Sequence, residues 1–150
     1  MKRLILPFVI LGLVSGCQAT EITLRPTRDI ARAAHGGMPA ENRACNRSYR
    51  HQDVWLIEHR CADQAPGITL VDATGTRRFA SYDPAFTEWA WQEDCNREDD
   101  CYYTLSLDAQ GRITDFAYHF DINLSEGVIR VRVDAGRLVV TDRRIIEHPS

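Results

Sequence analysis

The chain has 150 residues, with 18 basic and 21 acidic side chains and a formal net charge of −3 at neutral pH. A net acidic chain without a dominant basic stretch argues against nucleic acid as a partner. After the N-terminal segment, roughly 130 residues remain, which is enough for one hydrophobic core of modest size. The sequence therefore predicts one small domain.

The N-terminal segment has the layout of a secretory signal peptide. A short basic start is followed by an apolar run over residues 4–14 and by two small residues. An apolar core of this length is too short to remain as a membrane-spanning helix. We therefore expect residues 1–16 to be removed on export, and the loss of their two basic side chains changes the net charge from −3 to −5.

This segment ends in Val14-Ser15-Gly16-Cys17, which resembles the lipobox of bacterial lipoproteins. The resemblance implies a diacylglycerol on the Cys17 sulfur, cleavage before that residue and acylation of its new amine. Two or three acyl chains hold a protein durably at a membrane, since each buried methylene contributes about 0.8 kcal/mol. Gln18 stands where an aspartate would resemble the inner-membrane retention signal of enteric bacteria, so we expect the outer membrane, facing the periplasm. The alternative is an ordinary secreted protein whose signal ends near a cysteine.

Residues 17–26 are expected to form the lipidated N-terminus and a short tether, and residues 27–150 a single disulfide-braced, β-rich domain. A brief helix is predicted over residues 27–35, because Thr27 or Asp29 can cap its start and two glycines follow it. A second short helix is predicted to begin at Asp83-Pro84, with an N-cap residue followed by proline at the first helical position.

Most of the remaining chain carries strand signals. Seven runs are rich in β-branched and aromatic residues, namely residues 54–60, 68–71, 77–82, 102–107, 113–122, 128–133 and 138–146. Three connections begin with Asp and end with Gly two or three residues later, a pattern that is typical of short hairpins. They are Asp72 to Gly75, Asp108 to Gly111 and Asp134 to Gly136. The expected fold is α+β, a mostly antiparallel meander forming a small sandwich or half-barrel with one or two short helices; the alternative is an all-β sandwich.

Four cysteines remain after processing, an even number that favours two disulfides in an oxidising compartment. Four cysteines permit three connectivities, and we expect local pairing. Cys45 and Cys61 are symmetric about Asp53, so a hairpin turning at residues 51–53 would bring them together. Cys95 and Cys101 would then close a small loop.

The segment from Glu93 to Cys101 is unusually acidic. Its carboxylates could coordinate calcium, but the glycine and the bidentate glutamate of an EF-hand loop are missing, so we expect no metal and no cofactor. A negative patch beside exposed aromatic rings suits a basic protein partner, although a merely solvated loop is the plainer alternative. The candidate protein-binding residues are Trp91, Asp94, Glu98, Asp99, Asp100 and Tyr102.

Charged or ionisable side chains alternate with apolar ones along two of the predicted strands. In residues 113–122 the aromatic side chains alternate with Ala117, His119 and Asp121, so we expect an aromatic core face and a solvated face that carries the histidine. Arginines alternate in residues 128–133 and recur in the next run, at positions 130, 132, 137, 143 and 144. They could form a small basic face for lipid phosphates or an acidic partner, or protect a sheet edge from unwanted pairing.

No nucleophile, zinc or phosphate-loop motif is present, so no catalytic residue is assigned. We expect a non-enzymatic protein-binding module at the membrane. By analogy with other small envelope lipoproteins of similar fold and location, it would be an inhibitor or immunity-type protein against an envelope hydrolase. An acidic loop would be attracted to the basic surface of such an enzyme. The competing expectation is a structural or accessory lipoprotein of an envelope or secretion assembly.

Overall fold

The computed structural model describes residues 19–27, 45–63, 65–80, 95, 100–122 and 124–149. These residues form nine β-strands and no helix. The strands are β1 (Thr20–Thr27), β2 (Arg47–His51), β3 (Val54–His59), β4 (Gly67–Asp72), β5 (Gly75–Ala80), β6 (Cys101–Leu107), β7 (Ile113–Ile122), β8 (Ser125–Asp134) and β9 (Arg137–Glu147).

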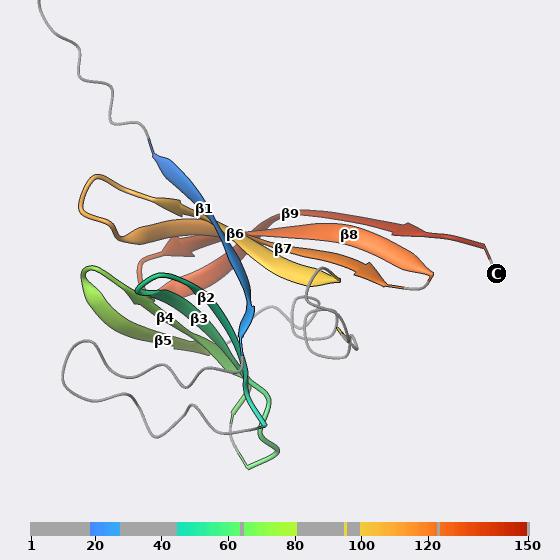
Figure 1. Cartoon of the computed structure of the whole chain (residues 1–150), viewed down its shortest axis with the longest axis horizontal. Helices are drawn as coiled ribbons and strands as arrows, with labels where there is room; N and C mark the ends of the chain where they lie inside the picture. Colours follow the sequence, from blue (N-terminus) through green and yellow to red (C-terminus); the bar gives the residue numbers. More distant parts are fainter. Residues whose placement is uncertain are drawn as a thin grey trace, which may run out of the picture.

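All nine strands belong to one antiparallel sheet, in the order β5-β4-β3-β2-β1-β6-β7-β8-β9. Strands β2 to β5 and strands β6 to β9 are two meanders in which chain neighbours pair. Between them lies β1, whose Thr20 to Leu24 portion pairs with β6 and whose last three residues pair with β2. In Figure 1, β1 crosses between the two groups of strands, and the sheet curls into a half-barrel.

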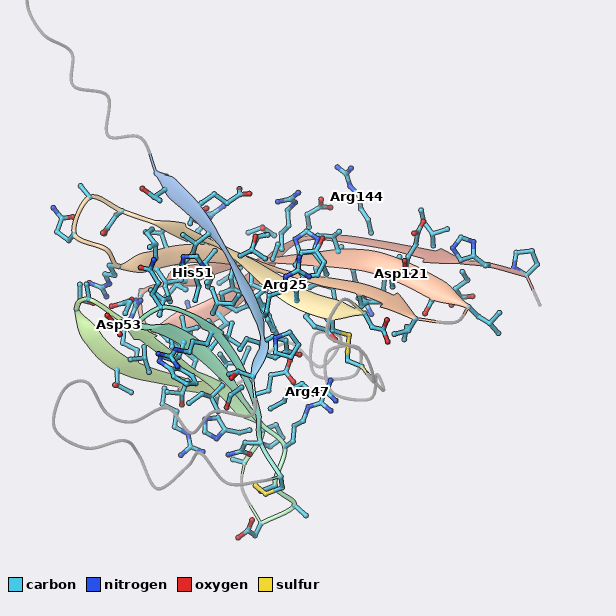
Figure 2. All side chains as sticks on the ribbon, in the orientation of Figure 1. Arg25, Arg47, His51, Asp53, Asp121 and Arg144 are labelled. Atoms are coloured by element: carbon cyan, nitrogen blue, oxygen red, sulfur yellow. A yellow bond between two sulfur atoms is a disulfide. The ribbon has the colours of Figure 1, made fainter. Side chains whose placement is uncertain are left out.

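The hydrophobic core fills the space between the two meanders. Figure 2 shows side chains crowding there. Along β7 the period-two pattern is clear, because Phe116, Tyr118 and Phe120 are buried while Asp115 and Asp121 are exposed. Both meanders and β1 contribute to the buried cluster, which contains Leu24, Tyr49, Leu56, Ile68, Leu70, Phe79, Cys101, Tyr103, Leu105, Ile113, Phe116, Tyr118, Phe120, Ile129, Val131 and Leu138.

A buried carboxylate ties the two meanders together. Asp72, at the end of β4, accepts a hydrogen bond from the backbone N–H of Ile113 at 2.9 Å, across 41 residues of sequence. Arg77 Nη2 donates both to Asp72 Oδ2 (2.7 Å) and to the Ile113 carbonyl (3.0 Å). Burial opposes ionisation of Asp72, but hydrogen bonds from Thr74 and Ile113 outweigh it and lower its pKa. The ionised Asp72 carboxylate therefore links the β4–β5 turn to the start of β7.

The hairpin turns have the chemistry that the sequence predicts. Asp72 Oδ1 accepts from the Thr74 N–H at 2.8 Å, and Asp108 Oδ1 accepts from the Gln110 N–H at 2.9 Å. Gly136 has a φ of 77° and follows Ala135 at 44°, so the β8–β9 turn takes the left-handed conformation that glycine favours.

The described residues confirm a meander-like, curled antiparallel sheet and each of the seven predicted strands, with somewhat different bounds. They are all-β, which differs from the expected α+β class. The helix expected from Asp83 and nearly all of the one expected over residues 27–35 lie outside the described residues. Thr27, the expected start of the latter helix, is the last residue of β1.

The expected tether at residues 17–26 is the clearest difference, because the central strand begins at Thr20. Its alternation explains this: Leu24 is fully buried and Ile22 packs against the core, whereas Glu21 and Arg25 are exposed. Pro26 argues against a central strand, since it has no N–H to donate. It is tolerated because the pairing with β6 ends at Leu24, so only β2 pairs with β1 at that point.

Candidate functional site

Both predicted disulfides are present, and they lie on the side of the sheet where the same strand ends meet. Cys45–Cys61 joins the open ends of the β2–β3 hairpin, with the two Cα atoms 5.2 Å apart. Cys95–Cys101 lies at the start of β6, with the two Cα atoms 5.6 Å apart. β1, β3 and β7 end on this side, and β2 and β6 begin there, so we call it the disulfide end of the strands. The opposite end of the strands is the turn end, where β1 starts and the hairpin turns at residues 52–53, 73–74, 108–112 and 135–136 are found.

Buried tyrosines connect the second disulfide with the first meander. The Tyr118 hydroxyl lies 3.2 Å from the sulfur of Cys95 and 3.2 Å from that of Cys101. Its ring centroid lies 5.0 Å from that of Tyr103, which in turn makes an edge-on contact with Tyr49 at 4.7 Å. A continuous aromatic path therefore runs from the disulfide into the core.

This path ends at Glu58, a fully buried carboxylate on β3. The Tyr103 hydroxyl donates to its Oε1 at 2.7 Å, and Arg60 Nε donates to its Oε2 at 2.8 Å. Burial raises the pKa of Glu58 despite the opposing effects of Arg60, Tyr103 and Arg47. Burial and this carboxylate also raise the pKa of Tyr103, which keeps its hydroxyl protonated and able to donate.

Two neighbouring donors in this region, Arg47 Nη1 and the Tyr49 hydroxyl, are shielded from solvent. Neither makes a hydrogen bond of good geometry with a described residue, although the two side chains interact with each other. Arg47 faces Glu58 across the β2–β3 pair, and although burial opposes it, the fields of Tyr49 and Glu58 raise the pKa of Arg47. The disulfide end thus contains two guanidinium groups around a single buried carboxylate.

On the outer face of the sheet, Tyr102 stacks on His119 with ring centroids 4.6 Å apart and planes 3° from parallel. The Arg25 guanidinium lies 4.9 Å from the centroid of the Tyr102 ring. His119 Nε2 is 2.9 Å from the Thr104 hydroxyl, and partial burial followed by the field of Arg130 lowers its pKa. These contacts hold the rings in one orientation across β1, β6 and β7.

A groove of about 250 Å³ lies beside this stack on the outer face. Its shape follows from Ala117, whose small side chain leaves room between longer neighbours on β6 and β8. It is smaller than most pockets that hold drug-sized ligands. The polar lining consists of Glu21, Thr104, Ser106, Asp115, Arg130 and Thr141.

Two of the six predicted protein-binding residues are described. Tyr102 is partly exposed in the stack, and Asp100 is partly exposed just before β6, where its carbonyl accepts from the Asp121 N–H at 2.8 Å. Both lie at the disulfide end, next to Cys101. Trp91, Asp94, Glu98 and Asp99 lie outside the described residues.

The prediction for β7 is confirmed in part: the aromatic face is buried and His119 and Asp121 share the opposite face, but that face is not fully solvated, because Ala117 is buried and His119 is partly buried. Asp121 does not contact the imidazole, whose described contacts are with Tyr102 and Thr104. Within the ranges that the structure describes, no group of three His, Cys, Asp or Glu side chains could hold a metal ion.

The outer faces of β8 and β9 carry mixed charges instead of a uniformly basic surface. Arg130 and Arg144 lie 4.0 and 3.2 Å from Asp142, and Arg132 lies 4.0 Å from Asp115. These pairs are exposed and contribute little to stability individually. In Figure 2, Arg144 points away from the sheet.

Sequence reasoning missed the network around Glu58. The available signal was an acidic residue at the end of the apolar run Val54-Trp55-Leu56-Ile57, which is an uncommon place for an unpaired charge. Its partner Tyr103 lies 45 residues away, so the pairing depends on how the sheet curls.

No described helix is long and apolar enough to cross a membrane. Comparisons with protein-family models, with curated proteins and with solved structures find no match to this chain.

Proposed function

We propose that this protein is a lipid-anchored lipoprotein of the bacterial envelope that acts as a non-enzymatic protein-binding module. The observation that carries the proposal is the pair of disulfides, which lie at the disulfide end of the strands, opposite the start of β1. Disulfides form and persist in oxidising compartments such as the periplasm. The lipobox-like segment before Cys17 supplies the matching export route, and outer-membrane attachment follows from Gln18.

The acidic segment is the proposed contact with the partner. Two of its residues, Cys95 and Cys101, form a disulfide with their Cα atoms 5.6 Å apart at the start of β6. Such a cross-link reduces the conformational entropy that a segment loses on binding. The partner class that fits is a basic envelope enzyme such as a lysozyme-like hydrolase, which this protein would inhibit or neutralise.

Capture of a partner from periplasmic extract tests this proposal. We expect the variant D94N/E98Q/D99N/D100N to lose most of the capture seen with the unchanged protein, because it removes the charge that attracts a basic surface. The matched control is E21Q/D53N/D115N/D134N, which removes the same number of charges from exposed positions near the turn end. Equal capture by both variants would exclude the acidic segment as the contact.

The second candidate is an accessory lipoprotein that joins an envelope assembly through a sheet edge. It is favoured by β9, which pairs with β8 along its length and with no other described strand. Val139 and Ile146 on this strand are 39% and 55% exposed. Such a protein would co-purify with a membrane complex and would be insensitive to the acidic-segment variant.

A further inference from the structure

The distance along the chain between the proposed anchor and the sheet is very short. Cys17 precedes Thr20, the first residue of β1, by three residues. An extended chain advances at most about 3.6 Å per residue, so the connection from Cys17 to the central strand can span at most roughly 11 Å. If acyl chains on Cys17 lie in the bilayer, the start of β1 must be at the bilayer surface. This step rests on the proposed function.

We infer that the half-barrel stands on the lipid surface with its turn end toward the bilayer and its disulfide end away from it. Thr20 pairs with Leu107, which immediately precedes the β6–β7 turn. The β4–β5 turn is brought to the same place by the hydrogen bonds of Asp72 with Ile113. Figure 1 shows the start of β1 and both of these turns on the left, and Figure 2 shows Asp53 of the β2–β3 turn on that side.

The turn end carries exposed side chains of both signs, with the carboxylates of Glu21, Asp53 and Asp134 beside the guanidinium groups of Arg112 and Arg137. Two further carboxylates are used within the fold: Asp72 bonds to Thr74, Arg77 and Ile113, and Asp108 accepts from two backbone N–H groups of its own turn. Neither of the two arginines forms an ion pair with a described residue, so both guanidinium groups are available to headgroups. Guanidinium groups bind phosphate oxygens with paired hydrogen bonds, so these two side chains meet lipid headgroups.

The strand lengths set how far the opposite end stands from the lipid. β7 has ten residues, and at about 3.3 Å per residue it spans roughly 33 Å. Cys101, Asp100 and the β7–β8 turn at Leu124 lie at its far end. Anionic headgroups would repel the acidic segment, and in this orientation Cys95, Asp100 and Cys101, the described residues of that segment, lie at the end away from the headgroups.

Energy transfer to labelled lipid measures the orientation directly. The lipidated protein carrying Q110C or L124C is labelled with one dye, since both positions are exposed, and is reconstituted into vesicles of phosphatidylethanolamine and phosphatidylglycerol containing a headgroup-linked acceptor. We expect transfer to be several-fold stronger from position 110 than from position 124. Equal transfer would mean that the half-barrel lies on its side, and reversed transfer that it is inverted; either result overturns the inference.

The role of the arginines has its own comparison. The variant R112Q/R137Q should bring the two transfer efficiencies closer together, whereas R143Q/R144Q, on the distal half of β9, should leave them unchanged. An unaltered ratio in R112Q/R137Q would overturn the assignment of those two side chains to the headgroups. Protein whose mass shows no lipid and which does not bind the vesicles would instead contradict the proposed function, so the two failures are distinguishable.

Discussion

Replacing Glu58 by alanine is expected to destabilise the protein by about 3–5 kcal/mol, because it removes one member of a buried ionic network and leaves the others uncompensated. The Tyr103 hydroxyl and Arg60 Nε each lose their acceptor, at 2.7 and 2.8 Å, and Arg47 loses a nearby opposite charge. Urea unfolding followed by the fluorescence of the buried Trp55 measures the loss. A change below about 1 kcal/mol would show that the network adds little to stability.

The conservative variant E58Q separates packing from charge. Since the pKa of Glu58 is raised above its usual value of 4.5, its contribution to stability is fully present below that pH and is lost as the pH rises through the folded-state value. Glutamine does not titrate. The unfolding free energy of the unchanged protein relative to E58Q should therefore fall as the pH rises from 4.5. A relative stability that rises over this range would contradict the direction of the pKa shift.

Removing the Cys45–Cys61 bridge with alanine at both positions is expected to cost about 3 kcal/mol, through the greater entropy of the unfolded chain. This bridge spans 16 residues, whereas Cys95–Cys101 spans only 6, so the same change at the second bridge should cost about 2 kcal/mol. Thermal unfolding of the two double variants under identical conditions compares them. A larger loss for the shorter loop would show that its contacts with Tyr118 outweigh the loop-entropy effect.

Local sequence signals were sufficient for most of the sheet. Alternating apolar residues identified seven strands, and the Asp and Gly residues of the turns identified the hairpins that join them. The symmetric spacing of Cys45 and Cys61 about Asp53 gave the β2–β3 hairpin and its disulfide. Each of these features depends on residues close together in the chain, which is why a sequence reveals them.

The missing parts depend on contacts between distant segments. β1 resembles a tether because it follows a lipobox-like segment and contains Pro26, and its central place is fixed only by pairing with β6 and β2. The stack of Arg25, Tyr102 and His119 requires the register of three strands. Glu58 meets Tyr103 only after the two meanders curl toward one another. No periodicity within one strand encodes such approaches.

In the proposed function, lipid on Cys17 confines this half-barrel to a membrane in an oxidising compartment. Intact-mass measurement of the protein purified from its native membrane fraction tests this proposal most directly. We expect a chain that begins at Cys17, carries a diacylglycerol and an additional acyl group, and contains both disulfides. A soluble product that retains residues 1–16, or that begins at any other residue, would contradict it.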